Sequence, residues 1–190
     1  MCLMWLLSFG VLLFCVTHLI PSLLPNTKTR LVSRLGENGY KGIFSLALLL
    51  SIACIVFGWR SAAVNHVYQP EPALRDLALG LIVLAFLLMV AASRQTRLKR
   101  IVRHPQLTGV ILWASAHLLL NGDNRSLVLF GGLAAWSLIE IFAINQREGA
   151  WVKPDIPSWG SEVLTAVIAC FVIAVLVALH PYIAGMPVVV

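Results

Sequence analysis

Two histidines stand inside strongly apolar stretches of this sequence. His18 follows the run LLFCVT, and His117 follows the run LWASA. Ligand-forming side chains are rare within membrane-spanning helices, because burying them in hydrocarbon is costly. A lone neutral histidine usually bonds to a neighbouring helix, whereas two in one small bundle can build a cofactor site from facing helices. Imidazole nitrogen is the common axial ligand of haem iron, so haem is the cofactor that this pair would suit.

The stretch RLKRIVRHPQLTG, residues 97–109, carries a second set of candidate binding residues. Pro105 suits the first turn of a helix, so Arg103 and His104 would stand where that helix enters the membrane. Cations and free helix N–H groups meet there, which predicts an anion site. A phospholipid head group is the simplest occupant, and a haem propionate or a cofactor carboxylate is the alternative. His104 is also an alternative iron ligand.

Other polar side chains receive plainer interpretations. Glu140 is expected to extend toward Arg147 at the membrane surface, with a proton-handling role as the alternative. His180 precedes Pro181 near a helix end and is expected to be interfacial. The four cysteines show no CxxC spacing, so they are expected to act as small hydrophobic residues rather than as a metal or redox site.

The composition excludes a soluble fold. Of 190 residues, 59% are hydrophobic and only 12% are charged, and the mean hydropathy is +0.89. A soluble chain of this length could not bury so much apolar surface, whereas lipid can cover it. We therefore predict one all-α membrane domain over residues 1–190, with the lipid bilayer as its partner. The net charge of +6 fits basic loops beside membrane spans, so no nucleic-acid partner is expected.

Six apolar segments predict a polytopic bundle of transmembrane helices. Most have 18 to 22 residues, close to the roughly 20 that cross a hydrocarbon core. The fourth has only 16, so it would thin the bilayer, begin below the surface, or pair with the fifth. The short polar turn NGDN favours an antiparallel hairpin of those two. The predicted segments are residues 3–24, 41–59, 76–93, 105–120, 126–144 and 162–180.

The basic residues predict the orientation of the bundle. Loops after the first, third and fifth segments hold eleven of the fourteen Lys and Arg residues. The other side holds only Arg60, Arg75 and Arg125. Because cytoplasmic loops carry an excess of Lys and Arg, the first group is expected in the cytoplasm and both termini outside. We further expect any active centre to lie where the fourth segment faces the first.

Four motifs, in this order, resemble the NnrU family across most of the chain: HLIPSLL from His18, RLVSRLGENGYKGIFSL at 30–46, RHPQLTGVILWASAHLLLNGD at 103–123, and HP at 180–181. That family is named for a denitrification-associated bacterial gene and includes the plant 15-cis-zeta-carotene isomerase. The resemblance implies a haem b protein of the bacterial inner membrane, with His18 and His117 as iron ligands. It also implies either isomerisation of a hydrophobic small-molecule substrate or an accessory role in nitrogen-oxide metabolism.

One position departs from the isomerase pattern. The isomerase carries a cysteine three residues before its second histidine, proposed to exchange with a histidine ligand when the iron changes oxidation state. Ala114 stands at that position here, so no thiolate is present there. Iron held by two histidines has no open coordination position, so electron transfer is the expected role unless one histidine leaves.

Two other functions stay open on the sequence. RHP before an apolar hairpin resembles isoprenylcysteine carboxyl methyltransferases, in which this motif helps to bind S-adenosylmethionine. Glu140, Arg147 and Glu148 could supply the acidic and arginine residues of that family, although Leu107 stands where it usually has tyrosine. A non-catalytic membrane assembly factor is the third possibility.

Overall fold

A computed structural model describes residues 3–185 and residue 188 of the chain. These residues form helices and no named strand, which is the expected solution in lipid, because a helix satisfies its own backbone hydrogen bonds. Five helices are long and apolar enough to cross a membrane, and a shorter apolar helix spans Pro105–Leu120. The predicted all-α membrane bundle is confirmed, including its short fourth helix.

The helices follow the predicted segments to within a few residues, apart from one long extension. The fifth span is continuous but begins with one turn of α-helix and a π-helical stretch. Short 3-10 turns at Pro72–Leu74 (η1) and Arg97–Arg100 (η2) lie in the connections. The elements of the six spans are α1 (Met4–Leu23), α2 (Pro25–Ser61), α3 (Arg75–Ala92), α4 (Pro105–Leu120), α5 (Asn124–Ser126), η3 (Leu127–Gly131), α6 (Gly132–Glu148) and α7 (Trp159–Ala184). The fifth span consists of α5, η3 and α6.

The first connection differs from the sequence prediction. A proline such as Pro21 is expected to break a helix, because it removes a backbone hydrogen bond. Helix α1 nevertheless continues through Pro21 to Leu23, so that expectation is wrong. Helix α2 begins at Pro25, well before the apolar run, and is interrupted at Gly36, where φ is 71° and ψ is 166°. That backbone conformation favours glycine, since it has no Cβ. The segment before Gly36 is largely exposed and polar, so it forms a surface helix leading into the span.

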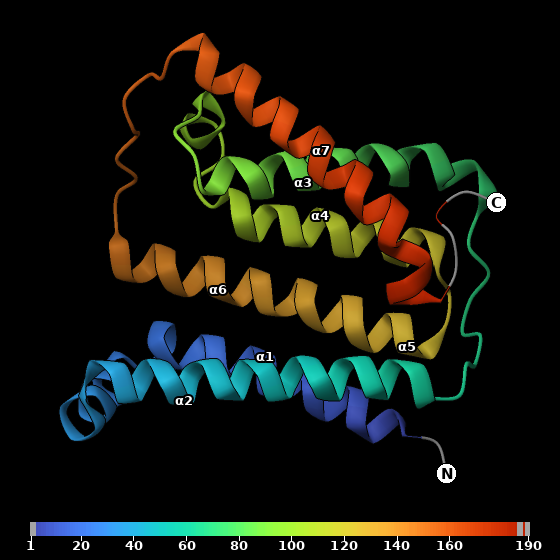
Figure 1. The fold of residues 1–190 in the computed structure, drawn as a ribbon, viewed down its shortest axis with the longest axis horizontal. Coiled ribbons are helices and arrows are strands. Elements are labelled where there is room, and N and C mark those ends of the chain that lie inside the picture. The colour runs from blue at the N-terminus through green and yellow to red at the C-terminus, as the bar shows by residue number, and fades with distance from the viewer. Residues whose placement is uncertain (1–2, 186–187, 189–190) are drawn as a thin grey trace.

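The spans pack as hairpins around a central helix. Helix α1 packs along α2, and α3 packs along α4. Helix α6 lies between α1 and α4 and contacts both, while α7 crosses α3 obliquely (Figure 1). The start of α1 and the end of α7 lie at the same end of the bundle (Figure 1), as six spans require. The contact between α4 and α6 confirms the predicted hairpin of the fourth and fifth segments.

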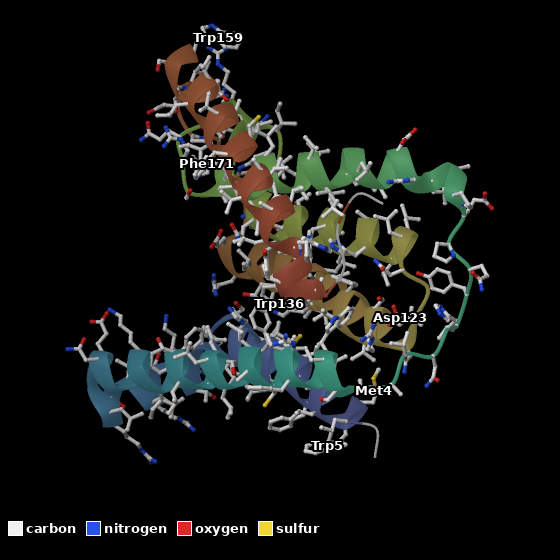
Figure 2. All side chains as sticks on the ribbon, turned by 45° about the vertical axis from the view of Figure 1, so that its right-hand side comes forward. Met4, Trp5, Asp123, Trp136, Trp159 and Phe171 are labelled. Atoms are coloured by element: carbon white, nitrogen blue, oxygen red, sulfur yellow. The ribbon has the colours of Figure 1, made fainter. Side chains whose placement is uncertain are left out.

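The bundle has two chemically different ends. We call the end formed by residues 24–40, 93–104 and 149–158 the basic end, and the end formed by residues 62–74 and 121–125 the opposite end. Trp159 marks the first and Asp123 the second (Figure 2). Between them, large apolar side chains on the outer surface are exposed, among them Leu46 at 67% and Phe171 at 68%, as expected where lipid covers a helix.

Candidate functional site

His18 lies on α1 within an aromatic cluster. Its Nδ1 is 2.9 Å from the carbonyl oxygen of Phe14, one turn earlier. The imidazole centroid is 4.2 Å from the ring of Phe14 and 5.7 Å from that of Phe44 on α2. It is also 5.0 Å from the ring of Trp136 on α6. Three helices therefore surround this half-buried histidine with aromatic rings.

His117 has the same local arrangement on α4. Its Nδ1 is 2.8 Å from the carbonyl oxygen of Trp113, again one turn earlier. The imidazole stacks on Phe130, with ring centroids 4.4 Å apart and an interplanar angle of 25°. Phe130 belongs to the π-helix η3. Such stretches are uncommon and often occur at functional sites.

The donor chemistry of each imidazole suits a metal ligand. When Nδ1 carries the proton, it donates to the backbone carbonyl and leaves Nε2 as the free lone pair. Metal-binding histidines usually have their second nitrogen held in this way, which fixes the tautomer and the ring orientation. His18 and His117 each meet that requirement. Each can therefore present Nε2 as a ligand atom when Nδ1 carries the proton.

The rings of His18 and His117 contact different residues of the fifth span. His18 contacts Trp136 and His117 contacts Phe130, and these two partners are six residues apart, about 9 Å along a helix axis. They also lie on different faces of the fifth span, because six residues correspond to a rotation of about 120°. The expectation that segment four faces segment one is wrong, because α6 separates them (Figure 1). The two rings therefore contact the fifth span at different positions along its length.

The RHP motif is bonded within the protein. Arg103 Nη1 donates to the carbonyl oxygen of Gly149 at 2.8 Å, and Nη2 is 3.8 Å from a carboxylate oxygen of Glu148. His104 Nε2 is 2.8 Å from Oδ1 of Asn145. The motif thus fastens the start of α4 to the end of α6. The predicted anion or cofactor role of Arg103 and His104 stays a prediction, and an anion there would compete with Glu148.

Glu140 is not placed as expected. Its Oε1 accepts a hydrogen bond from Ser22 on α1, whereas Arg147 lies 3.4 Å from Glu148. Oε2 of Glu140 is buried without a partner, as are Nε1 of Trp136 and Oγ of Ser137. These three side chains share one face of α6, since they stand one, three and four residues apart. The sequence shows the spacing of these three residues, but it does not show that Glu140 is buried against α1.

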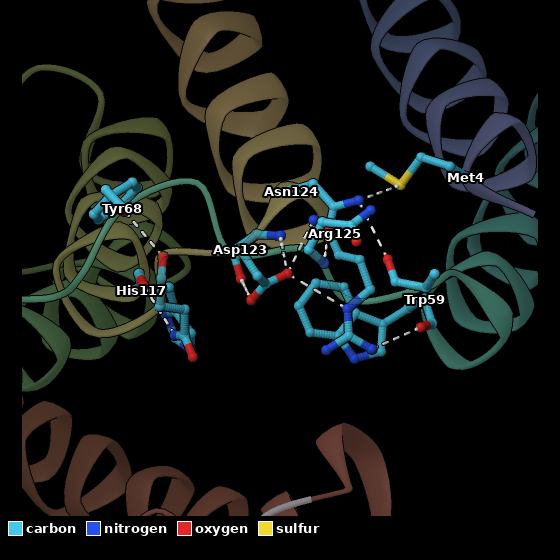
Figure 3. Close-up of polar contacts among 11 residues, drawn as sticks. Met4, Trp59, Tyr68, His117, Asp123, Asn124 and Arg125 are labelled. Carbon is cyan, nitrogen blue, oxygen red and sulfur yellow. Dashed lines mark hydrogen bonds and ion pairs between the residues drawn. The ribbon is translucent and has the colours of Figure 1, made fainter. Parts of the chain in front are cut away.

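A hydrogen-bond network at the opposite end was not predicted from the sequence (Figure 3). Asp123 accepts bonds from the backbone N–H groups of Arg125 and Ser126 and from the Ser126 hydroxyl. Arg125 also donates to the carbonyl of Trp59 at 3.2 Å, with its guanidinium 4.6 Å from that ring. Burial would raise the pKa of Asp123, but bonds from Ser126, then the charge and N–H of Arg125, hold it below its ordinary value.

The same network holds the loop between α2 and α3. Tyr68 donates its hydroxyl proton toward the carbonyls of Leu118 and Asn121 at the end of α4. Its own backbone N–H bonds to the carbonyl of Gly122 at 3.1 Å. Burial and the nearby Asp123 carboxylate raise the pKa of Tyr68. An Asp before an apolar run is a recognisable helix N-cap, but no sequence signal pairs Tyr68 with this turn.

Comparison with known proteins gives one assignment. No curated protein and no solved structure matches the chain. The NnrU protein family matches residues 6–188, which includes both histidines, the RHP motif and every described helix apart from the first residues of α1. Because this match spans nearly the whole chain, the protein belongs to the NnrU family.

Proposed function

We propose that this protein is a haem b-binding integral membrane protein of the bacterial inner membrane. The observation that supports it most directly is the imidazole of His117, whose Nδ1 is tied to the Trp113 carbonyl and whose ring stacks on Phe130 in a π-helix. This arrangement leaves Nε2 free to bind iron in apolar surroundings. His18 repeats the local geometry and is the second proposed ligand.

The separation of the two histidines bears on which reaction is reasonable. When bound, haem supplies a one-electron couple. If only His117 held the haem, the group would be able to bind a small molecule, which would suit an accessory role with nitrogen oxides. Isomerisation of a polyene or lipid-like substrate is less well supported, because Ala114 offers no thiol for ligand exchange.

The methyltransferase alternative gains no support from the RHP motif. Arg103 and His104 are the residues that would contact S-adenosylmethionine in that proposal. Both are bonded to the last turns of α6 and the residue after them, and Arg103 faces the Glu148 carboxylate. We therefore prefer the haem proposal.

An absorption spectrum of protein purified from haem-replete cells tests the proposal. We expect a Soret band that is lost or shifted in His117→Ala. If His18 also binds that iron, His18→Ala shifts the band as well, and a single-histidine site leaves it unchanged. His66→Ala, an exposed loop position, is the matched control and keeps the wild-type spectrum. Colourless wild-type protein, or a band unaffected by both ligand substitutions, would refute the proposal.

A further inference from the structure

A cavity of about 450 Å³, wide open to the outer surface of the bundle, lies between α3, α4 and α7 near the basic end. It lies apart from the two histidine clusters, which are built on α1, α2, α4 and α6. Its volume is on the scale of sites for small amphipathic molecules. The lining residues are Phe86, Met89, Val90, Ser93, Arg94, Gln106, Ile168 and Val172.

The lining changes from polar to apolar with depth in the membrane. Ser93 and Arg94 follow the end of α3, and Gln106 stands in the first turn of α4, so the polar groups gather at the membrane surface. Phe86 lies eight residues earlier on α3, about 12 Å deeper. Val172 lies four residues beyond Ile168 on α7, further from the start of that helix. The cavity therefore suits a molecule with a polar head at the basic end and an apolar chain toward the bilayer centre.

Arg94 is the charged group of this cavity, and it has no ion-pair partner among the described residues. Its Nε donates to Oγ1 of Thr165 on α7 at 3.0 Å, which orients the guanidinium and leaves its other N–H groups available. Just beyond it, Oγ1 of Thr96 and Nε of Arg97 are buried without a partner. Glu162, one turn before Thr165 on α7, accepts a hydrogen bond from the backbone N–H of Arg97 at 2.7 Å.

The neighbouring arginines are used differently. Arg97 lies 4.0 Å over the ring of Trp159, Arg100 donates to the carbonyl of Pro154 at 2.5 Å, and Arg103 donates to that of Gly149. These three fasten the connection between α6 and α7. Arg94 is the one of the series that lines the cavity, so its charge is free to bind an anion from outside the protein.

We propose that this cavity binds an anionic phospholipid, with the phosphate at Arg94 and one acyl chain along Met89, Ile168 and Val172. A guanidinium forms paired hydrogen bonds to phosphate oxygens. Basic pockets between helices at the cytoplasmic surface are suited to anionic lipid head groups. The acyl chain fills the apolar depth that a free anion would leave uncovered. This site is independent of haem.

Native mass spectrometry of the detergent-purified full chain tests the site. We expect dioleoyl phosphatidylglycerol to be retained in preference to dioleoyl phosphatidylcholine, which has the same chains but no net charge. Arg94→Gln should weaken phosphatidylglycerol binding by about tenfold, the loss expected for a charge-assisted bond. Arg94→Lys keeps the charge and should retain most of the preference. Val172→Phe should reduce retention of both lipids by filling the chain end of the cavity.

The control is Arg34→Gln, which removes an exposed positive charge from the same end of the bundle. It should leave lipid preference unchanged. Equal losses in Arg34→Gln and Arg94→Gln would overturn the proposal, because they would indicate a diffuse surface charge effect. Equal retention of the two lipids by wild type would also overturn it. If excess inorganic phosphate displaced the lipid fully, the acyl-chain contact would be refuted.

Discussion

The two ends of the bundle differ in whether their buried polar side chains have hydrogen-bond partners. At the opposite end, Asp123 and Ser126 are buried and hydrogen-bonded to each other. From the middle of the fifth span to the basic end, five buried side-chain polar atoms lack a partner, and the described part of the chain has no other such side-chain atom. They are Oγ1 of Thr96, Nε of Arg97, Nε1 of Trp136, Oγ of Ser137 and Oε2 of Glu140.

This difference is consistent with a structural role for the opposite end and with the proposed lipid site near the basic end. Most buried polar groups in proteins have a hydrogen-bond partner, so each exception needs an explanation. At the opposite end the bonds are complete, and they join the loop between α2 and α3 to the turn between α4 and α5. Toward the basic end, unmet polar atoms lie close to a cavity and to the His18 cluster. We therefore expect substitutions at the two ends to differ in their effects on stability.

The largest expected effect is at Gly122. A Cβ at this position would collide with the backbone carbonyl of Tyr68, and backbone cannot move aside as a flexible side chain can. Gly122→Ala should cost about 3 kcal/mol or more by overpacking. Gly80→Ala is the matched control, because no atom lies within 4 Å of a Cβ there. Thermal unfolding in detergent measures both, and equal midpoints would show that the turn does not hold the loop.

Asp123 should give the next largest effect. Asp123→Ala removes the N-cap of α5 and should cost about 1–2 kcal/mol. Because the pKa of Asp123 is below its ordinary value in the folded protein, its carboxylate adds stability above the ordinary pKa. That contribution is lost as the pH falls through the folded-state pKa. Asp123→Asn should therefore be less stable than wild type at neutral pH, and the two should converge in acid.

Thermal midpoints of wild type and Asp123→Asn, taken across a pH series, measure this difference. Other carboxyl groups titrate in both proteins, so only the gap between the two curves reports on Asp123. A gap that is constant from neutral to acid pH would show that the charge of Asp123 contributes nothing to stability.

Two serines give the smallest effects and the sharpest comparison. Ser126 and Ser137 are both fully buried, but only Ser126 donates to a partner, Oδ2 of Asp123 at 2.8 Å. Ser126→Ala should cost about 1 kcal/mol, and Ser137→Ala should be neutral or slightly stabilising, because it removes an unsatisfied hydroxyl. Chemical denaturation in mixed micelles measures both. A loss in Ser137→Ala as large as that in Ser126→Ala would remove the contrast between the two ends.

The positions of the spans could be predicted because hydrophobicity and length alone select membrane helices. The prediction failed at Pro21, where the helix continues, and before residue 41, where a polar segment is helical. Neither region is decided by hydropathy. A proline is tolerated in a membrane helix when neighbouring groups adapt to the lost backbone bond.

The candidate site was predicted only as a set of residue types. The sequence indicated His18 and His117 as possible ligands, and each has a free Nε2 of the expected kind. It could not show that α6 stands between their helices, because packing order depends on contacts between segments far apart in the chain. The same reason explains why the partner of Glu140 was wrong: Ser22 is 118 residues away.

Composition and hydropathy by themselves determined that this chain is an all-α membrane bundle with six spans. In lipid, every apolar segment must satisfy its own backbone hydrogen bonds, and a helix does so. The order of its motifs also indicated the NnrU family. Only the tertiary structure decided which polar groups are satisfied and which are left open, since a hydrogen bond requires two atoms within reach of each other. That distinction separates the bonded turn at Asp123 from the cavity at Arg94.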